Sequence, residues 1–362
     1  MNQTRIDNLT RQLKKASLAG MMVCPSEELQ FLAGFTPKMC ERFQALFVTD
    51  GGKTFFVCNL LYRGEIERDL GPDVAVYIWR DGESMTDVVK QAFAENGLAG
   101  TTLGVNSTAP AFNVLGIAQD CGVTFTNGVP IIEEARIVKT AQEINDLRKS
   151  AQIADAAFSA VLTFIKPGMK EADVMQFLAE HMKSAGGTHT WGIIASGPNS
   201  SYPHYHAYDR MIKEQDIMIL DFGCRFNGLY SDMSRTVFVG GITDEQRKIY
   251  GIVRRAYEAG EQAAVTGAYI PDVDKAARDI IASEGYGDAF LNRVGHGIGY
   301  MIHEAPDIKK NNYRNLEPGM AFSIEPGIYF AGKFGMRIEN IVVTTPDGNE
   351  VLNKSSKEII IL

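Results

Sequence analysis

The sequence predicts a mixed α/β (α+β) protein with a smaller amino-terminal α/β domain at 1–135 and a larger domain at 136–362. Three observations support this fold class. The chain has 362 residues, which is too long for one ordinary hydrophobic core. Short β-rich runs and helical patterns alternate in its first third. A long helical pattern at 139–165, stopped by Pro167 and Gly168, then opens the second domain.

The first domain begins with a helical pattern and continues with a hairpin pattern. The helix is predicted from apolar residues at helical spacing, namely Ile6, Leu9 and Leu13. We expect Gly20 to end it. The β-rich runs at 45–48 and 54–57 flank an Asp-Gly-Gly turn at 50–52, which favours a hairpin. This domain contains no paired catalytic groups, so we expect it to support or cover a site.

The second domain carries a faint internal repeat. The segment from Gly168 reads GMKEADV, and the segment from Gly267 reads GAYIPDV. In both, another glycine follows eighteen positions later, at Gly186 and Gly285. The repeat predicts two similar α/β halves related by a pseudo-twofold axis, with a site between them.

Composition excludes several classes of function. The net charge is -8 and the isoelectric point about 5.4, so no basic stripe for nucleic acid is expected. No apolar run approaches the ~20 residues that span a bilayer, and the first residues lack a signal-peptide core. The five cysteines are scattered, without a CxxC pair, which favours reduced thiols and a cytoplasmic protein. They are Cys24, Cys40, Cys58, Cys121 and Cys224.

Two aspartates fall within a predicted hairpin, DIMILDFGCRFNGLYSDMSRTVFV, whose turn is Asn227-Gly228. In that register Asp221 faces Ser234, and Asp221 and Asp232 share one face of the ladder. Diagonal neighbours lie roughly 7–8 Å apart at the backbone, which suits two carboxylates that share metal ions. The alternative is a pair of solvated surface aspartates. The apolar run at 217–220 favours burial, where two aspartates require a cation or a proton.

Three further motifs carry candidate ligands. In GHGIGYMIHE, glycines flank His296 and allow close approach of backbone or ligand, and His303 follows. FSIEPGIY supplies Glu325, and GMRIENIVV supplies Glu339. Both glutamates belong to predicted strands, at 320–325 and 336–344, so we expect them on neighbouring strands of another hairpin, joined by a long, glycine-rich loop. Each residue alone is weak support for a site, and the set together is what indicates one.

The motifs SGPNSSYPH, DFG, YSDMSRT, GHGIGYMIHE, IEPGIY and MRIEN resemble, in order, those of the pita-bread (creatinase/aminopeptidase) metallopeptidases. The resemblance covers essentially the whole chain and is to the proline-directed branch, which contains aminopeptidase P and Xaa-Pro dipeptidase (prolidase). It implies five ligands for two divalent metal ions: Asp221, Asp232, His296, Glu325 and Glu339. Four carboxylates and one imidazole favour Mn²⁺, with Co²⁺ or Zn²⁺ as alternatives.

The resemblance also implies a mechanism, hydrolysis by a hydroxide that the two metal ions generate from water. Glu325 is then the proton shuttle, and His204 and His303 contact the substrate and the developing oxyanion. Arg337 is expected to pair with a ligand carboxylate. The remaining histidines are assigned structural or surface roles: His206, His181 and His189.

The implied substrates are proline-containing peptides, and aminopeptidase P activity is slightly favoured over prolidase activity. The reason is Asp307, which stands near the place where some dipeptidases of this branch carry a carboxylate-binding arginine. Prolidase remains the alternative, with Arg293 or Arg314 in that role.

Four rivals are weaker. Methionine aminopeptidase usually lacks an amino-terminal domain of this size, creatinase lacks the metal ligands, and a non-catalytic protein-binding module is expected to lose ligands. A generic α/β protein would have to match the five ligand motifs in order by coincidence. A homodimer is expected by analogy alone.

Overall fold

A computed structural model describes residues 1–362, and the chain forms two compact units, Met1–Arg136 and Ile137–Leu362. No helix in either unit is both long and apolar enough to cross a membrane.

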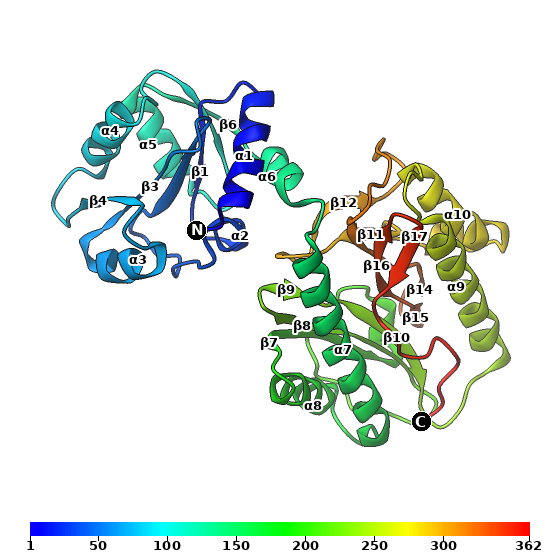
Figure 1. The fold of residues 1–362 in the computed structure, drawn as a ribbon. Helices are drawn as coiled ribbons and strands as arrows, with labels where there is room; N and C mark the ends of the chain where they lie inside the picture. The colour runs from blue at the N-terminus through cyan, green and yellow to red at the C-terminus, as the bar shows by residue number, and fades with distance from the viewer. The chain divides into compact units, whose positions relative to one another are not determined.

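The first unit is built on a six-stranded mixed sheet in the order β4-β3-β2-β1-β5-β6 (Figure 1). Its strands are β1 Gly20–Val23, β2 Ala45–Thr49, β3 Thr54–Asn59, β4 Ala75–Trp79, β5 Thr102–Val105 and β6 Thr124–Asn127. Its helices are α1 Gln3–Lys15, α2 Glu27–Ala33, α3 Arg63–Leu70, α4 Met85–Glu95, α5 Ala111–Cys121 and α6 Val129–Arg136, with a 3-10 turn η1 at Leu60–Tyr62. Helix α1 packs beside α6, and α4 beside α5.

The first predicted helix is confirmed, and its three predicted apolar residues are buried. Its predicted end is wrong, because α1 stops at Lys15 and Gly20 begins β1. A side chain at Gly20 would place its Cβ 2.7 Å from the carbonyl oxygen of Val48, so this glycine serves strand pairing and not helix termination. The predicted hairpin is confirmed as β2 and β3, with Val48 opposite Thr54.

The second unit is the pita-bread fold, with two α/β halves. The first half contains α7 Ala141–Phe164, α8 Glu171–Ser184, β7 Thr188–Ser196, η2 Gly197–Ser201, β8 Ile217–Phe226, β9 Leu229–Tyr230 and β10 Met233–Phe238. The second half contains α9 Asp244–Ala263, α10 Ile270–Ser283, η3 Gly287–Ala289, β11 Gly295–Gly297, β12 Glu304–Ile308, β13 Ala321–Ile324, β14 Gly327–Phe330, β15 Phe334–Arg337, β16 Asn340–Thr345 and β17 Gly348–Val351. The sheets run β10-β8-β7 with β9 paired to β8, β12-β11-β13-β16-β17, and β14-β15.

The internal repeat is confirmed in the backbone. Gly168 and Gly267 have φ values of 90° and 84°, in the left-handed region that favours glycine, and each lies just before the second helix of its half. Equivalent antiparallel bridges follow these glycines, Lys170 with Met211 and Tyr269 with Asn315. The first helix of each half also begins with a threonine capping box.

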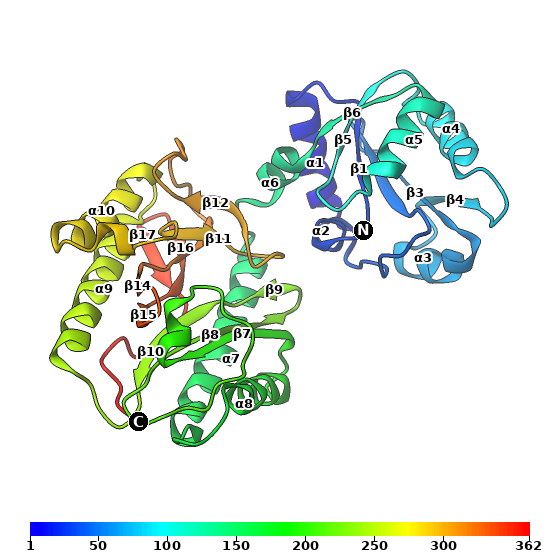
Figure 2. The ribbon, with the colours of Figure 1, turned by 180° about the vertical axis from the view of Figure 1, so that it is seen from behind.

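Each half has its own hydrophobic core, and the cores hold the sheets in place. Helices α7 and α8 pack on β8 and β7, while α9 and α10 pack on each other and α9 also contacts β13 (Figure 2). Fully buried residues at the helix–sheet interfaces include Phe158 and Leu220 in the first half and Tyr257 and Phe322 in the second. The strands that carry the candidate ligands are therefore supported from outside by helices.

Candidate active site

The hairpin that carries the two aspartates has the predicted register. Phe226 pairs with Leu229, and Asp221 pairs with Ser234. Asp232 lies in the short break between β9 and β10, and both aspartates are buried. A Cβ at Gly223 would lie 1.9 Å from the Ser231 carbonyl oxygen, so glycine is required where the strands approach most closely.

His296 lies at the centre of β11, between β12 and β13. Its two flanking glycines admit neighbouring backbone: a Cβ at Gly295 would lie 1.8 Å from the Ser323 carbonyl oxygen, and one at Gly297 would lie 2.3 Å from Ala305. The Nδ1 of His296 is 3.1 Å from the carbonyl oxygen of Gly297. Because a carbonyl only accepts, Nδ1 carries the proton and Nε2 is left with a free lone pair.

The two glutamates lie just beyond the ends of neighbouring strands, β13 and β16, as the prediction of neighbouring strands requires. The single strand predicted at 336–344 is wrong, because the chain breaks at 338–339 between β15 and β16. Strand β13 pairs with β16, with Ile324 opposite Asn340, so Glu325 and Glu339 flank this pair. The glycine-rich segment between them, expected to be a loop, is a second hairpin formed by β14 and β15. Its residues Ile328 and Met336 are fully buried and pair with each other, so one face of this short hairpin belongs to the hydrophobic core.

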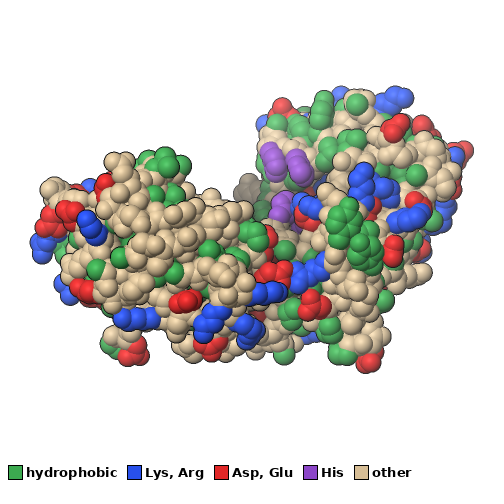
Figure 3. All heavy atoms as spheres, turned by 90° about the horizontal axis from the view of Figure 1, so that it is seen from above, with side chains coloured by type: hydrophobic (Ala, Val, Ile, Leu, Met, Phe, Trp, Pro, Cys, Tyr) green, Lys and Arg blue, Asp and Glu red, His purple; other side chains and the backbone are tan.

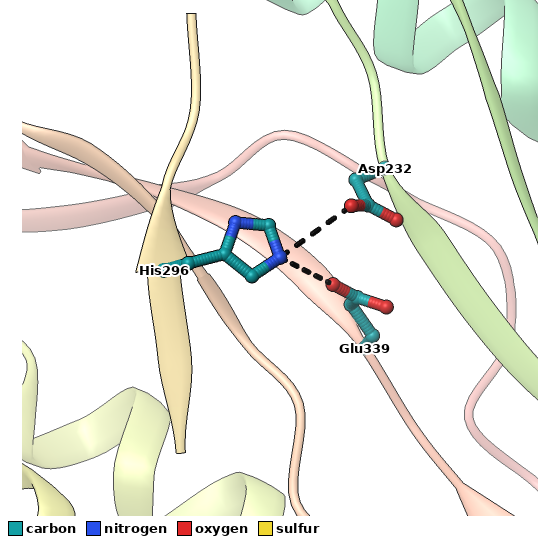
Figure 4. A group of neighbouring side chains, drawn as sticks. All are labelled: Asp232, His296 and Glu339. Carbon is teal, nitrogen blue, oxygen red and sulfur yellow. Dashed lines mark ion pairs between the residues drawn. The ribbon is translucent and has the colours of Figure 1, made fainter. Parts of the chain in front are cut away.

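The five candidate ligands converge in one place. The Nε2 of His296 lies 3.6 Å from Asp232 Oδ2 and 3.8 Å from Glu339 Oε1 (Figure 4). It also lies 3.5 Å from Glu325 Oε1. Among the candidate ligands, three buried carboxylate oxygens have no hydrogen-bond partner, namely Asp221 Oδ1, Asp232 Oδ1 and Glu339 Oε1. Asp232, His296 and Glu339 each offer a ligand atom, and these atoms lie within 4.8 Å of one another. Buried carboxylate oxygens beside an unprotonated imidazole nitrogen are a donor set for divalent cations. The residues present therefore fit the metal ions that the sequence implies.

These side chains line a cavity of about 760 Å³ in the second unit. All eight residues singled out in the sequence contribute to it, and the others are Trp191, Ile193, Pro203, His206, Asn292, Arg293 and Ile302. Figure 3 shows histidine side chains gathered at one place on the surface. His206 is one of the cavity histidines, although the sequence assigned it a structural or surface role. Its spacing of two from His204 was the available signal, since alternate residues of an extended segment share a side.

Comparisons with known proteins agree with this arrangement. Residues 145–346 match the profile of metallopeptidase family M24, and residues 5–138 match the creatinase/prolidase amino-terminal domain. The chain belongs to the M24 metallopeptidases. It is a metal-dependent exopeptidase of their proline-directed branch.

Its relatives match over nearly their whole length. A "Probable dipeptidase PepE" of Mycobacterium tuberculosis is 34% identical, covering 96% of this chain and 93% of the relative. The Xaa-Pro dipeptidase of Pyrococcus furiosus is 31% identical, covering 98% and 99%. Among solved structures, a dipeptidase of Pyrococcus horikoshii has a TM-score of 0.93 at 32% identity, covering 99% and 100%. An X-Pro aminopeptidase of Thermotoga maritima has a TM-score of 0.86 at 26% identity, covering 99% of both chains.

Arg337 connects several of the candidate ligands. Its guanidinium pairs with Asp221, donates from Nε to Ser234 Oγ at 2.7 Å and donates from Nη1 to Tyr329 Oη at 2.7 Å. The Ser234 hydroxyl in turn donates to Glu339 Oε2 at 2.7 Å. One buried cation therefore orients carboxylates from both halves of the unit.

The carboxylates of the M24 site repel one another in a buried place. Burial, followed by the charges of Glu339 and Asp221, raises the pKa of Asp232 well above its ordinary value. Burial and the charge of Glu325 do the same to the pKa of Glu339. Burial, with Asp221, raises the pKa of Glu325 to about 7. Burial and the neighbouring His303 lower the pKa of His296. Without a cation, the cluster therefore holds protons at neutral pH.

A pH-dependent stability of the metal-free enzyme follows. Above a pH of about 7.5, His204, His296 and His303, whose pKa values are lowered, are almost entirely neutral in both the folded and the unfolded chain. The folded protein alone still holds protons on Asp232 and Glu339, whose pKa values are raised well above their ordinary range, and on a remaining fraction of Glu325. Stability is then lost as pH rises through these values, because the native state must release protons that the unfolded chain lacks.

We expect the melting temperature of metal-free protein to fall by roughly 2–5 °C between about pH 7.5 and 9. Calorimetry in a chelator measures this shift. Saturating Mn²⁺ should abolish it, because bound cations stabilise the ionised carboxylates. A melting temperature that rises over this interval without metal would contradict the assignment of a proton-holding cluster.

Proposed function

We propose that this M24 peptidase is an Xaa-Pro dipeptidase (prolidase). It hydrolyses the bond before proline with two divalent ions held by five residues, Asp221, Asp232, His296, Glu325 and Glu339. The oxygen-rich donor set favours Mn²⁺, with Co²⁺ or Zn²⁺ as alternatives. The three dipeptidases named above are 31–34% identical over 93–100% of their own length, whereas the aminopeptidase named above is 26% identical.

The proposed preference for dipeptides rests on the ion pairs that Asp307 forms with Arg293 and Lys309. The sequence argument for aminopeptidase P required this aspartate to repel a substrate carboxylate. Its Oδ1 lies 3.2 Å from Arg293 Nη1 and its Oδ2 lies 2.5 Å from Lys309 Nζ, so its charge is compensated. The reason for favouring aminopeptidase P activity, an uncompensated charge on Asp307, therefore does not apply.

Arg293 supplies the cation that a dipeptide needs. The cavity is lined by two arginines and no lysine, and Arg337 is buried and committed to Asp221. Arg293 has a side chain that is 33% exposed and donors beyond the single contact with Asp307. It is therefore placed to bind the free carboxylate of an Xaa-Pro dipeptide, a group that lies further from the scissile bond in longer peptides.

The remaining residues have distinct roles in hydrolysis. When bound, the two metal ions activate the attacking water and polarise the scissile carbonyl. Glu325, whose carboxylate lines the cavity 3.5 Å from His296, takes a proton from that water and delivers it to the proline nitrogen when the C–N bond breaks. His204 and His303 line the cavity and donate hydrogen bonds to the carbonyl oxygen as its negative charge develops. Arg337 fixes the orientation of Asp221.

The test compares Leu-Pro, Leu-Pro-amide and Leu-Pro-Gly with Mn²⁺-loaded enzyme and an EDTA control. We expect Leu-Pro to be preferred and Arg293→Met to raise KM for Leu-Pro by roughly 10–100-fold, with little effect on Leu-Pro-amide. Lys309→Met is the matched control, since it removes the other cation beside Asp307, and should change KM less than ~3-fold. Preference for Leu-Pro-Gly would make the enzyme an aminopeptidase P. Bound metal without cleavage of any of the three would exclude both activities.

A further inference from the structure

A buried ion pair outside the cavity lies directly beside the loop that carries His303. Lys139 Nζ is 2.7 Å from Glu304 Oε1, and the two side chains are 1% and 0% exposed. Neither residue lines the cavity, whereas Ile302 and His303, which immediately precede Glu304, both do. The other oxygen of Glu304 accepts a hydrogen bond from Met301 N at 3.2 Å. One carboxylate thus joins Lys139 to the backbone of the loop.

The fit around the pair leaves little freedom. A Cβ at Gly299 would lie 2.4 Å from Glu304 Oε1 and 2.8 Å from Lys139 Cε, so the loop rests on the ion pair at this glycine. Lys139 is itself fixed, because its backbone N–H donates to the Gly319 carbonyl at 2.8 Å. The pair is therefore a rigid support and not a flexible surface contact.

The hairpin of β8 and β9 holds the same loop by two further bonds. Tyr230 N donates to the Gly299 carbonyl at 2.9 Å, and Arg225 Nη2 donates to the Tyr300 carbonyl at 3.2 Å. The loop is thus held by the hairpin that carries Asp221 and by the ion pair. At the end of this loop, the His303 ring centroid lies 4.3 Å from that of His296.

Stability alone does not account for such a pair. Two buried charges lose their hydration, and well-packed apolar residues of similar volume usually stabilise a protein as well or better. The ion pair instead fixes a geometry. Lys139 and Glu304 meet in one arrangement, in which the Glu304 carboxylate also accepts a hydrogen bond from Met301 N. An apolar pair would fill the space without fixing the loop.

We propose that Lys139 and Glu304 are positioning residues that hold the 298–303 loop so that His303 faces the reacting peptide. The inference rests on the proposed function in one respect, that His303 acts on the substrate. It predicts that the pair affects catalysis through His303 and not through the metal ligands.

The test is a double-mutant cycle in the full-length, Mn²⁺-loaded enzyme with Leu-Pro. We expect Lys139→Met and Glu304→Gln each to lower kcat/KM by roughly 10-fold or more, mostly in kcat, with bound metal unchanged. In a His303→Ala background the same changes should cost less than ~2-fold in kcat/KM, because the positioned group is gone.

The charge swap Lys139→Glu with Glu304→Lys should recover part of the activity. Lys357→Met, at a Lys–Glu pair with a 3.1 Å contact outside the cavity, should leave kcat/KM within ~2-fold.

A second readout does not depend on turnover. Amide hydrogen exchange of peptides covering residues 298–304 should be at least ~10-fold faster in metal-free Glu304→Gln than in metal-free wild type, with other strands unchanged. Additive effects in the His303→Ala background, or unchanged exchange of the loop, would overturn the proposal. If Lys139→Met does not fold, the isosteric Glu304→Gln decides both readouts. If wild type cleaves no proline dipeptide, the proposed function fails, and the exchange measurement still tests the positioning.

Discussion

Replacing Asp232 with asparagine is expected to lower kcat for an Xaa-Pro dipeptide by roughly 10³-fold or more and to release bound metal. Asparagine keeps the shape but removes the negative charge from a buried carboxylate whose Oδ1 has no partner within the protein. Metal analysis of the purified protein, with steady-state kinetics, measures both effects. The loss of kcat should persist when high Mn²⁺ restores metal binding, because the missing carboxylate charge also alters the acidity of the bound water.

The same substitution should stabilise the metal-free protein. The pKa of Asp232 is raised by burial and by the charges of Glu339 and Asp221, so its ionised form opposes folding at neutral pH. Asparagine mimics the protonated form permanently, and we expect a melting temperature a few degrees higher in chelator and lower than wild type in Mn²⁺.

Asp274→Asn is the matched control for this experiment. Asp274 is also buried, but its carboxylate is paired with Arg278 at 2.9 Å outside the cavity. Its substitution should lower the melting temperature with or without metal and leave the metal content unchanged. If Asp232→Asn behaved like this control, Asp232 would be a structural residue and not a metal ligand.

Elements whose geometry is fixed locally could be predicted from the sequence. The two-residue turn Asn227-Gly228 sets the register of its hairpin, and this alone places Asp221 opposite Ser234. The internal repeat is readable for a similar reason, since Gly168 and Gly267 each occupy a backbone conformation that favours glycine.

Contacts between distant segments could not be predicted in the same way. The sequence predicts a loop where β14 and β15 form a hairpin, because four-residue strands that contain glycine give no clear alternation of apolar and polar residues. The charge on Asp307 is compensated by Arg293, which belongs to the segment before β11. No local sequence pattern predicts this ion pair. The sequence assigns His206 a structural or surface role, and its place in the cavity is not readable locally because cavity walls are assembled from several elements.

The largest expected effect on stability is at Arg337. We expect Arg337→Met to destabilise the metal-free protein by about 3–5 kcal/mol, measured by urea unfolding in chelator. Burial alone would lower the pKa of this guanidinium, yet Tyr329 and the carboxylates of Asp221 and Glu339 raise it well above its ordinary value. Removing it leaves buried carboxylates without a counter-charge and the hydroxyls of Ser234 and Tyr329 without their donor.

Comparison with metal-loaded protein separates the charge of Arg337 from its geometry. Bound cations replace the missing positive charge, so saturating Mn²⁺ should reduce the destabilisation of Arg337→Met to less than half. Arg337→Lys keeps the charge but not the planar fork, and should lose less stability without metal while still lowering kcat. Arg148→Met, which removes a half-exposed pair with Glu350, should cost no more than ~1 kcal/mol. Equal destabilisation of Arg337→Met with and without Mn²⁺ would mean that the guanidinium packs the sheets together and does not balance the charge of a metal site.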